Sequence, residues 1–285
     1  MFQIPQKRNK NKEHDIKEAF FYMDLGLEDK VVLVTGANNG MGLAISKAFL
    51  DEGAKVAGGD LSGEHLKDLE PADSIYPIIA DLSTKEGTEK LVQECVDHFG
   101  KIDILVNNVG IANYKSSFLD LTDDDWNRTL QTNLYAMIRT SRAALPHLKK
   151  QSHSAIISIG SESGHVPDEF AIDYSVSKAG VINLTSALAH EFGNDGIRVN
   201  CVSPGPTRTN MWEQPGGMID MLAEKFSMDG EDAVKHFAAN VRQIPRGEIG
   251  KPDEIAQTVL FLASEKASYV NGAEFAVNGG SVRYH

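Results

Sequence analysis

The sequence is poor in cysteine, in long apolar runs and in positive charge. Its two cysteines, Cys95 and Cys201, stand far apart, so we expect no disulfide framework and no zinc site, and a cytoplasmic location is favoured. The nine histidines show no ligand spacing, so no metal is expected. The chain has no apolar run long enough for a membrane-spanning helix. The 28 Lys and Arg against 40 Asp and Glu give a formal net charge of -12, which argues against a nucleic-acid partner.

The chain divides into a short extension and one domain. Residues 1–27 carry a basic cluster near Lys7 and Lys12, then several acids, and lack the apolar segment of a secretory signal. We expect this extension to be mobile or to pack against a partner. With 41% hydrophobic and 24% charged residues, the chain has a globular composition, so residues 28–285 are expected to form a single domain.

A strand, a glycine-rich turn and a helix open this domain. Residues 30–34 are apolar and β-branched, which predicts a buried strand, and residues 41–49 show helical spacing that ends at Gly53. The glycines between them follow G-x-x-x-G-x-G rather than G-x-G-x-x-G. Glycines let a backbone approach a pyrophosphate, and a helix N-terminus offers free N–H groups. We interpret the turn as a nucleotide site formed by Gly36, Asn38, Asn39, Gly40, Met41 and Gly42.

Asp60 ends the second expected strand, residues 54–59, and lies 24 residues beyond Gly36. At this distance an acidic residue can bind the ribose hydroxyls of the adenosine. Its carboxylate would repel a 2′-phosphate, and no Lys or Arg stands beside it in the turn. This favours NAD over NADP as the cofactor. The alternative is that Asp60 only caps a loop.

Strands and helices alternate along the rest of the chain. This alternation predicts an α/β fold, a Rossmann-like doubly wound parallel sheet of about seven strands with helices on both faces. Ligands of such a sheet bind at the carboxyl ends of the strands. Beyond the first two, the expected strands are residues 74–80, 102–106, 154–159, 197–202 and 273–277, and the longer expected helices are 85–99, 127–149 and 174–192.

Tyr174 and Lys178 are four residues apart, so on a helix they share one face. An ammonium beside a phenol favours the phenolate and lowers its pKa toward neutrality. A phenol tuned in this way can exchange a proton with an alcohol or a carbonyl. The pattern is short and by itself weak evidence.

Other motifs strengthen the interpretation of Tyr174 and Lys178, because they follow one another along the chain in a fixed order. They are Thr35-Gly36-x-x-x-Gly40-x-Gly42, Asp81-Leu82, Asn107-Asn108-Val109-Gly110, Asn133, Ser161, Tyr174 with Lys178, Pro204-Gly205, Thr207, Thr209, Arg246 with Gly250, and Asn278-Gly279-Gly280. In this order, from residue 30 to residue 280, the chain resembles the short-chain dehydrogenase/reductase family. Val109 departs from the alanine of the family's pattern and adds bulk beside the cofactor.

The resemblance implies a role for each matched residue. Tyr174 would be the general acid/base, Lys178 would also bind the nicotinamide ribose, Ser161 would orient the substrate oxygen, and Asn133 would support a proton relay through water. Asp81 would contact the adenine ring. The remaining cofactor contacts would come from the glycine turn, Asp60, Leu82, Asn108, Gly110, Pro204, Gly205, Thr207 and Thr209.

Residues 206–245 are expected to cover the substrate. Within them Arg208 or Arg242 would bind an anionic substrate or face solvent. Glu162, next to Ser161, would hydrogen-bond a substrate hydroxyl or face water. The helix at 174–192 carries an apolar face, Val181 to Phe192, that belongs to the core or to a subunit interface.

These features predict an enzyme that transfers a hydride between NAD(H) and a secondary alcohol or ketone. The alternatives are an NADPH-dependent 3-oxoacyl-carrier-protein reductase, a sugar or polyol dehydrogenase, and a non-catalytic nucleotide-binding regulator. The expected partners are a small-molecule substrate and, by resemblance, other copies of the chain in a homotetramer or homodimer. No nucleic acid or membrane partner is expected.

Overall fold

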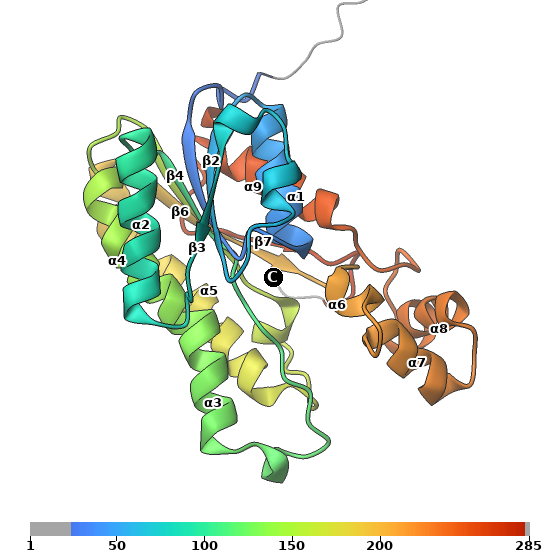
Figure 1. The fold of residues 1–285 in the computed structure, drawn as a ribbon. Helices are drawn as coiled ribbons and strands as arrows, with labels where there is room; N and C mark the ends of the chain where they lie inside the picture. The colour runs from blue at the N-terminus through green and yellow to red at the C-terminus, as the bar shows by residue number, and fades with distance from the viewer. Residues whose placement is uncertain (1–23, 283–285) are drawn as a thin grey trace, which may run out of the picture.

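Seven parallel strands form one sheet at the centre of the molecule (Figure 1). The computed structural model describes residues 24–282, and the strand order is β3-β2-β1-β4-β5-β6-β7. The predicted doubly wound α/β fold is confirmed. The strands are β1 Val31–Thr35, β2 Lys55–Asp60, β3 Ile75–Ile79, β4 Ile104–Asn107, β5 Ser154–Ile159, β6 Ile197–Pro204 and β7 Glu274–Val277.

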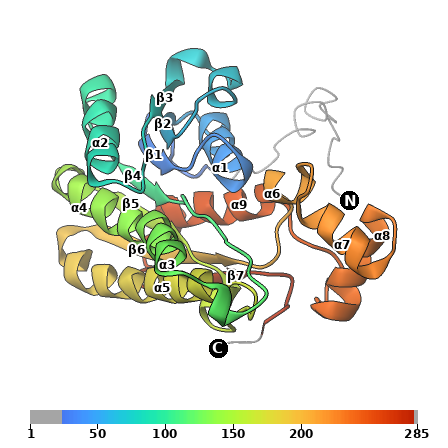
Figure 2. The same cartoon turned by 60° about the horizontal axis from the view of Figure 1, so that its bottom comes forward.

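Helices cover both faces of the sheet (Figures 1 and 2). On one face α1 packs against α9, and on the other α2 packs against α4 beside α5. Because the strands are buried on both faces, they read as continuous apolar runs in the sequence. The helices are α1 Gly40–Asp51, α2 Lys85–Phe99, α3 Asp123–Leu130, α4 Ala136–Leu148, α5 Ile172–Phe192, α6 Asn210–Glu213, α7 Met218–Phe226, α8 Gly230–His236 and α9 Pro252–Ala263.

The order of strand addition reverses between β1 and β4, which are neighbours in the middle of the sheet. Val34 of β1 pairs with Val106 of β4, so the loops that follow these strands leave the sheet side by side. In open α/β sheets the crevice at such a reversal is where ligands bind. The fold therefore brings the glycine turn and the Asn107-Asn108 loop to one place.

The helix expected at residues 127–149 is longer and is interrupted. It begins at Asp123, after a capping box in which the Thr122 hydroxyl accepts a hydrogen bond from the Asp125 N–H. Residues Gln131–Tyr135 then form a π-helical turn that contains Asn133. Such turns are frequent at functional sites. The hydrophobic periodicity of the sequence could not reveal this π-helical turn, because the turn adds one residue to the helix without ending it.

Residues 206–245 form a helical segment that projects from the sheet (Figure 1). It contains α6, α7, α8 and a π-helical turn at Phe237–Val241. Trp212, Leu222 and Val234 belong to a small apolar core of its own. The segment is therefore a packed unit rather than an irregular loop.

The predicted extension, residues 1–27, lies outside the described residues up to residue 23. Leu27 is 2% exposed and packs in the core between α1 and α9, so the domain begins before residue 28. Within residues 24–282, no helix is both long enough and apolar enough to cross a bilayer.

Candidate active site

The glycine turn after β1 lies so close to its neighbours that side chains would not fit. Gly36 has a φ of 64°, in the left-handed region that favours glycine. A Cβ on Gly42 would stand 2.0 Å from the Gly36 carbonyl oxygen. Asn108 Nδ2 donates to the carbonyl oxygens of Thr35 and Gly36, at 2.9 Å each. The loop after β4 thus fixes the shape of the turn, and this shape fits a nucleotide phosphate group.

The N-terminus of α1 is open toward the same side. Asn39 is the N-cap, but its side chain makes no capping hydrogen bond. Its Oδ1 accepts instead from Asn210 Nδ2 at 2.9 Å. A Cβ on Gly40 would stand 3.3 Å from the side chain of Thr209, so Thr209 lies against the turn. The first N–H groups of α1 therefore remain free for an anion.

Asp60 is held beside the glycine turn. Its Oδ2 accepts from the Asn38 N–H at 3.0 Å, and its Oδ1 accepts from the Leu61 N–H at 2.7 Å. Each oxygen keeps a second lone pair, which a ribose hydroxyl can use. The position suits a ribose ligand, and the same two bonds also suit a loop cap.

The side chain of Asn38 shapes the loop after β2. Its Nδ2 donates to Ser62 Oγ at 2.9 Å, and its Oδ1 accepts from the N–H groups of His65 and Leu66. His65 Nδ1 lies 3.0 Å from the Asn38 carbonyl oxygen, which only accepts, so Nδ1 carries the proton. His65, which the sequence argument missed, thus packs against the glycine turn.

The remaining predicted cofactor residues lie along the same edge of the sheet. Asp81 is exposed, and its Oδ1 accepts from Ser83 Oγ at 2.7 Å. The side chain of Leu82 is buried in the core, so a ligand would meet its backbone. A cavity beside the turn is lined by Met41, Asn108, Gly110, Pro204, Gly205, Thr207 and Thr209.

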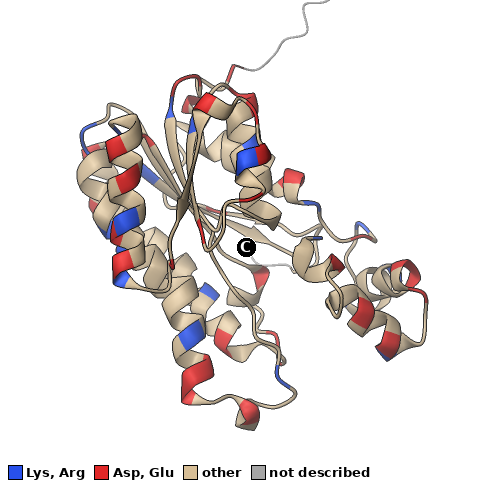
Figure 3. Cartoon of the chain, viewed as in Figure 1, with Lys and Arg blue, Asp and Glu red and all other residues tan. Residues whose placement is uncertain are grey.

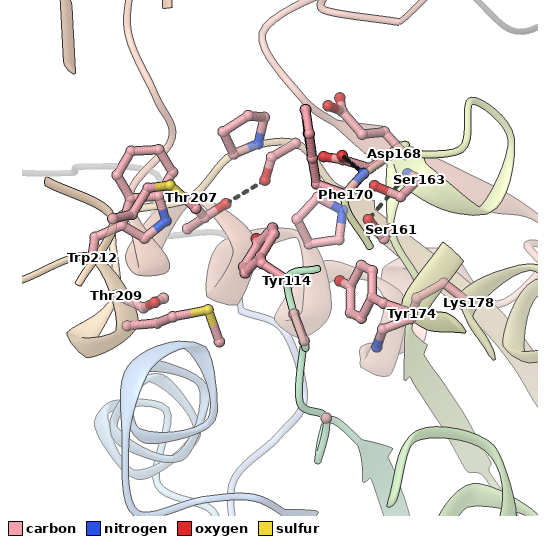
Figure 4. A pocket seen from close by; sticks show the side chains of 18 of the residues that line it. Tyr114, Ser161, Ser163, Asp168, Phe170, Tyr174, Lys178, Thr207, Thr209 and Trp212 are labelled. Atoms are coloured by element: carbon pink, nitrogen blue, oxygen red, sulfur yellow. Dashed lines mark hydrogen bonds between the residues drawn. The ribbon is translucent and has the colours of Figure 1, made fainter. Parts of the chain in front are cut away.

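Ser161, Tyr174 and Lys178 line this same cavity, which has a volume of about 830 Å³ (Figure 4). Ser161 follows β5, and the other two residues lie on the first turns of α5. Lys178 Nζ is 5.6 Å from the centre of the Tyr174 ring, as a spacing of one helical turn requires. The predicted hydroxyl, phenol and ammonium groups therefore meet beside the phosphate cradle.

The pKa of Tyr174 differs from our expectation. Burial raises the pKa of the phenol, a hydrogen bond with Ser161 lowers it, and the negative charge of Glu162 raises it again. The Lys178 ammonium lies 5.6 Å from the centre of the ring and donates to the Ile159 carbonyl oxygen at 2.8 Å. The net direction is therefore opposite to the lowering that the sequence predicts, and the effect of Lys178 on the phenol stays a prediction. Burial of the ring favours the protonated phenol.

Burial also shifts the pKa of Lys178. Only 4% of the residue is exposed, and desolvation lowers the pKa of its ammonium to about 8. The group therefore remains mostly protonated at neutral pH. A Cβ on Gly110 would stand 3.4 Å from Lys178 Nζ and 3.5 Å from Asn133 Oδ1, so this glycine keeps the space between them open.

Asn133 lies behind the cavity wall and joins two segments. It is 2% exposed. Its Oδ1 accepts from the Ile111 N–H at 2.8 Å, and its Nδ2 donates to the Ile111 carbonyl oxygen and to Ser177 Oγ, at 2.9 and 3.0 Å. Both amide hydrogens are used, so the side chain positions the loop after β4 against α5.

Glu162, Arg208 and Arg242 form ion pairs rather than simply facing solvent, which was one of their expected roles. Glu162 is 2% exposed and does not face water, since it accepts hydrogen bonds from the Arg242 guanidinium and the Ser281 hydroxyl. Arg208 pairs with Glu231 at 2.5 Å, away from the cavity. Neither arginine is a lone cation.

Sequence reasoning missed several residues of the cavity. Tyr114, from the loop after β4, stands between Tyr174 and Trp212 in Figure 4. Phe170 and Asp168, from the loop before α5, also line the wall. These residues lie in irregular loops without a spacing signal, so only the tertiary structure could reveal them. The complete site places a glycine turn and the phenol of Tyr174 beside a partly apolar cavity.

Comparison with known proteins agrees with this geometry. Residues 36–282 match a family model described as enoyl-(acyl carrier protein) reductase. The chain is 35% identical over 261 residues to a 3-oxoacyl-acyl-carrier-protein reductase FabG of Thermotoga maritima, covering 90% of this chain and 99% of that protein. It is 34% identical over 257 residues to a meso-2,3-butanediol dehydrogenase of Serratia marcescens, covering 89% and 95%. A solved structure of L-sorbose reductase from Gluconobacter frateurii with NADPH and L-sorbose superimposes with a TM-score of 0.85 at 28% identity, covering 92% of this chain and all of that one.

Proposed function

The chain belongs to the short-chain dehydrogenase/reductase family and is an oxidoreductase of alcohols and ketones, and we propose that its cofactor is NAD(H) and its general acid/base is Tyr174. The observation that carries the proposal is the meeting of Ser161, Tyr174 and Lys178 in one cavity beside the glycine turn. The bound nicotinamide would supply the hydride chemistry. The protein would supply position and a proton.

The residues of the site have separate tasks in this proposal. The Ser161 hydroxyl donates a hydrogen bond to the substrate oxygen and orients it above Tyr174. In oxidation the Tyr174 phenolate takes the proton of the substrate hydroxyl, and in reduction the phenol returns it. Lys178 would hold the ribose of the bound cofactor, and its ammonium, released from the Ile159 carbonyl oxygen, would stabilise the phenolate. Asn133 holds the neighbouring loop in place.

NAD is proposed over NADP because the carboxylate of Asp60 lies beside the glycine turn. A 2′-phosphate placed there would meet the negative charge of Asp60. The imidazole of His65 also contacts the turn, through Asn38 and Asn39. The L-sorbose reductase structure contains NADPH, so the relatives do not decide this point. The preference therefore has to be measured on this chain.

The test is titration of the protein with NADH and with NADPH, followed by cofactor fluorescence. We expect tight NADH binding and weak NADPH binding, because Asp60 accepts the ribose hydroxyls and repels the phosphate. In Asp60→Ala the preference should fall, while Asp68→Ala, an exposed acid on the same loop, should leave it unchanged. Preference of the wild type for NADPH would contradict the cofactor assignment.

A second candidate is an NADPH-dependent 3-oxoacyl-carrier-protein reductase, which the Thermotoga maritima relative favours. A sugar or polyol dehydrogenase is favoured by the likeness to L-sorbose reductase. Turnover of a 3-oxoacyl thioester, of L-sorbose and of a simple secondary alcohol separates these substrates. Cofactor binding without turnover of any of them would support a nucleotide-binding regulator.

We also propose that the chain forms a homotetramer or homodimer in the cytoplasm and that residues 206–245 cover the substrate. The last point is supported by Thr209, Trp212 and Arg242, which line the cavity from this segment. The cytoplasm is supported by Cys95 and Cys201, which are buried free thiols.

A further inference from the structure

The wall of the cavity is mainly apolar. Tyr114 and Phe170 contribute rings from two loops, and the 206–245 segment contributes Met211, Trp212 and Met221 (Figure 4). Several of these side chains are partly exposed although they are large and apolar, with Tyr114 at 41% and Met221 at 51%. Exposed apolar surface inside a cavity is stabilised when an apolar ligand covers it.

The cavity is too large for a small polar substrate alone. Its volume of about 830 Å³ must hold the reacting end of a cofactor as well as the substrate. Sites for drug-sized ligands have volumes of about 300–1,000 Å³. A substrate with only four to six carbon atoms would leave much of the apolar wall in contact with water.

The charges in the wall are balanced. Apart from the catalytic Lys178, its three basic residues are matched by three acidic ones, namely Lys115, Lys225 and Arg242 against Glu162, Asp168 and Glu169. With Lys178 included, the lining carries one net positive charge, and that charge lies beside Tyr174. The rest of the wall offers no net positive charge to a carboxylate or a phosphate.

Arg242 shows this balance most clearly. Its guanidinium donates to the buried Glu162, and its Nη1 lies 4.0 Å from Asp168 Oδ2. A guanidinium has five N–H donors, and the bond to Glu162 uses one of them, so donors of Arg242 remain for the cavity that it lines. Two carboxylates beside Arg242 compensate its positive charge. Its guanidinium can therefore donate a hydrogen bond to a neutral oxygen but does not attract an anion.

We propose that the substrate is a bulky, uncharged and mainly apolar ketone or secondary alcohol, with a second neutral oxygen that accepts a hydrogen bond from Arg242. This inference rests on the proposed function, because it assumes that the reacting carbon lies at Tyr174. The Glu162-Arg242-Asp168 cluster acts in it as the element that rejects anions.

The first test compares size. With the preferred cofactor, kcat/KM is measured for 2-tetralone, a bicyclic ketone, and for acetoin, a small hydroxyketone. Acetoin has a second oxygen and 2-tetralone does not, so a preference for 2-tetralone is due to size and not to the bond with Arg242. We expect 2-tetralone to be preferred by about tenfold or more, since each extra buried methylene contributes about 10–200-fold in an apolar pocket. Trp212→Ala should reduce this preference. Equal or higher kcat/KM for acetoin would overturn the size part of the proposal.

The second test compares charge at nearly constant shape. Methyl benzoylformate is neutral, and benzoylformate is its anion. We expect the ester to be preferred in the wild type and the ester-to-acid ratio of kcat/KM to fall about tenfold in Glu162→Gln or Asp168→Asn, because either change leaves Arg242 with unbalanced positive charge. Glu213→Gln, which removes a carboxylate paired with Arg208, should leave the ratio unchanged. A wild type that prefers the acid would overturn the charge part.

Ligand binding separates failure of this inference from failure of the proposed function. In a Trp126→Phe background, Trp212 is the one remaining tryptophan and reports on the cavity. Quenching by 2-tetralone and by methyl benzoylformate, but not by benzoylformate, supports the inference even if no hydride is transferred. In that case only the proposed function fails. Quenching by benzoylformate alone would overturn the inference whether or not turnover occurs.

Discussion

At the scale of single residues, Tyr174 shows how position decides chemistry. Its spacing from Lys178 predicts a lowered pKa, but burial and the charge of Glu162 raise the pKa of the phenol in the described structure. The ammonium that would lower it donates to the Ile159 carbonyl oxygen instead. A ligand that draws Lys178 toward the cavity would therefore be part of the activation of Tyr174.

Tyr174→Phe should lower kcat by about 10²–10⁴, the usual share of general acid–base catalysis, while NADH binding is retained. In the wild type, the rate of alcohol oxidation should rise with pH toward the alkaline side, because the phenolate is the base and burial raises its pKa. Stopped-flow kinetics across pH would measure both effects. A Phe variant with wild-type turnover, or an oxidation rate that falls as the pH rises, would remove Tyr174 from this role.

Lys178 should make the stability of the protein depend on pH. The folded state releases its proton near pH 8, and the unfolded state releases it near 10.5. Between these values the unfolded state binds more protons, so the free energy of unfolding should rise with pH over this range relative to Lys178→Met. Denaturant unfolding of both proteins at several pH values measures the difference. If the free energy of unfolding changed with pH in the same way in the wild type and in Lys178→Met, Lys178 would not be desolvated in the folded state.

At the scale of elements, the glycine turn and the π-helical turn at Gln131–Tyr135 bring the site together. The turn accepts no side chain at Gly42, because the Gly36 carbonyl oxygen occupies that place. The π-helical turn carries Asn133, whose amide holds Ile111 and Ser177. Glycine spacing reveals the first element in the sequence, whereas nothing in the sequence pattern reveals the second.

Gly42→Ala should abolish NADH binding and destabilise the protein by about 1–3 kcal/mol, the usual cost of overpacking. Gly247→Ala is the matched control, because Gly247 has a φ of 72° with nothing within 4 Å of an added Cβ. This substitution should lower the free energy of unfolding by about 1–2 kcal/mol through backbone strain alone, and NADH binding should be retained. Titration calorimetry measures NADH binding, and denaturant unfolding measures the free energy of unfolding. Full NADH binding by Gly42→Ala would contradict a phosphate cradle at this turn.

At the scale of the whole molecule, the apolar face predicted on residues 174–192 belongs to the core. Val181 is 2% exposed, and Leu188 and Phe192 pack against the core that α2 and α4 cover. The outer face of α5 carries small exposed residues such as Ala179 and Ala187. Small side chains let two helices approach closely, so this face is the one we expect to meet another subunit.

Light scattering in solution should therefore give the mass of a tetramer or a dimer. Ala187→Arg should lower that mass, because a long charged side chain separates two closely packed helices. Glu89→Arg, on the exposed face of α2, should leave the mass unchanged. A monomeric mass for the wild type would contradict the predicted assembly.

The sequence by itself determined the sheet, the glycine turn and the candidate catalytic residues. Their signals are local, since buried strands need apolar runs, close backbone approach needs Gly36 and Gly42, and the pairing of Tyr174 with Lys178 needs one helical turn. The order of motifs added Ser161 and Asn133 by resemblance.

Only the tertiary structure decided the surroundings of these groups. The burial of Glu162 against Arg242, the direction of the Lys178 ammonium and the apolar wall around Tyr114 all depend on segments far apart in the chain. Desolvation and charge balance arise from everything packed around a group, and a sequence pattern contains only its neighbours along the chain. For this reason the type of chemistry could be predicted from the sequence, whereas the character of the substrate cavity required the fold.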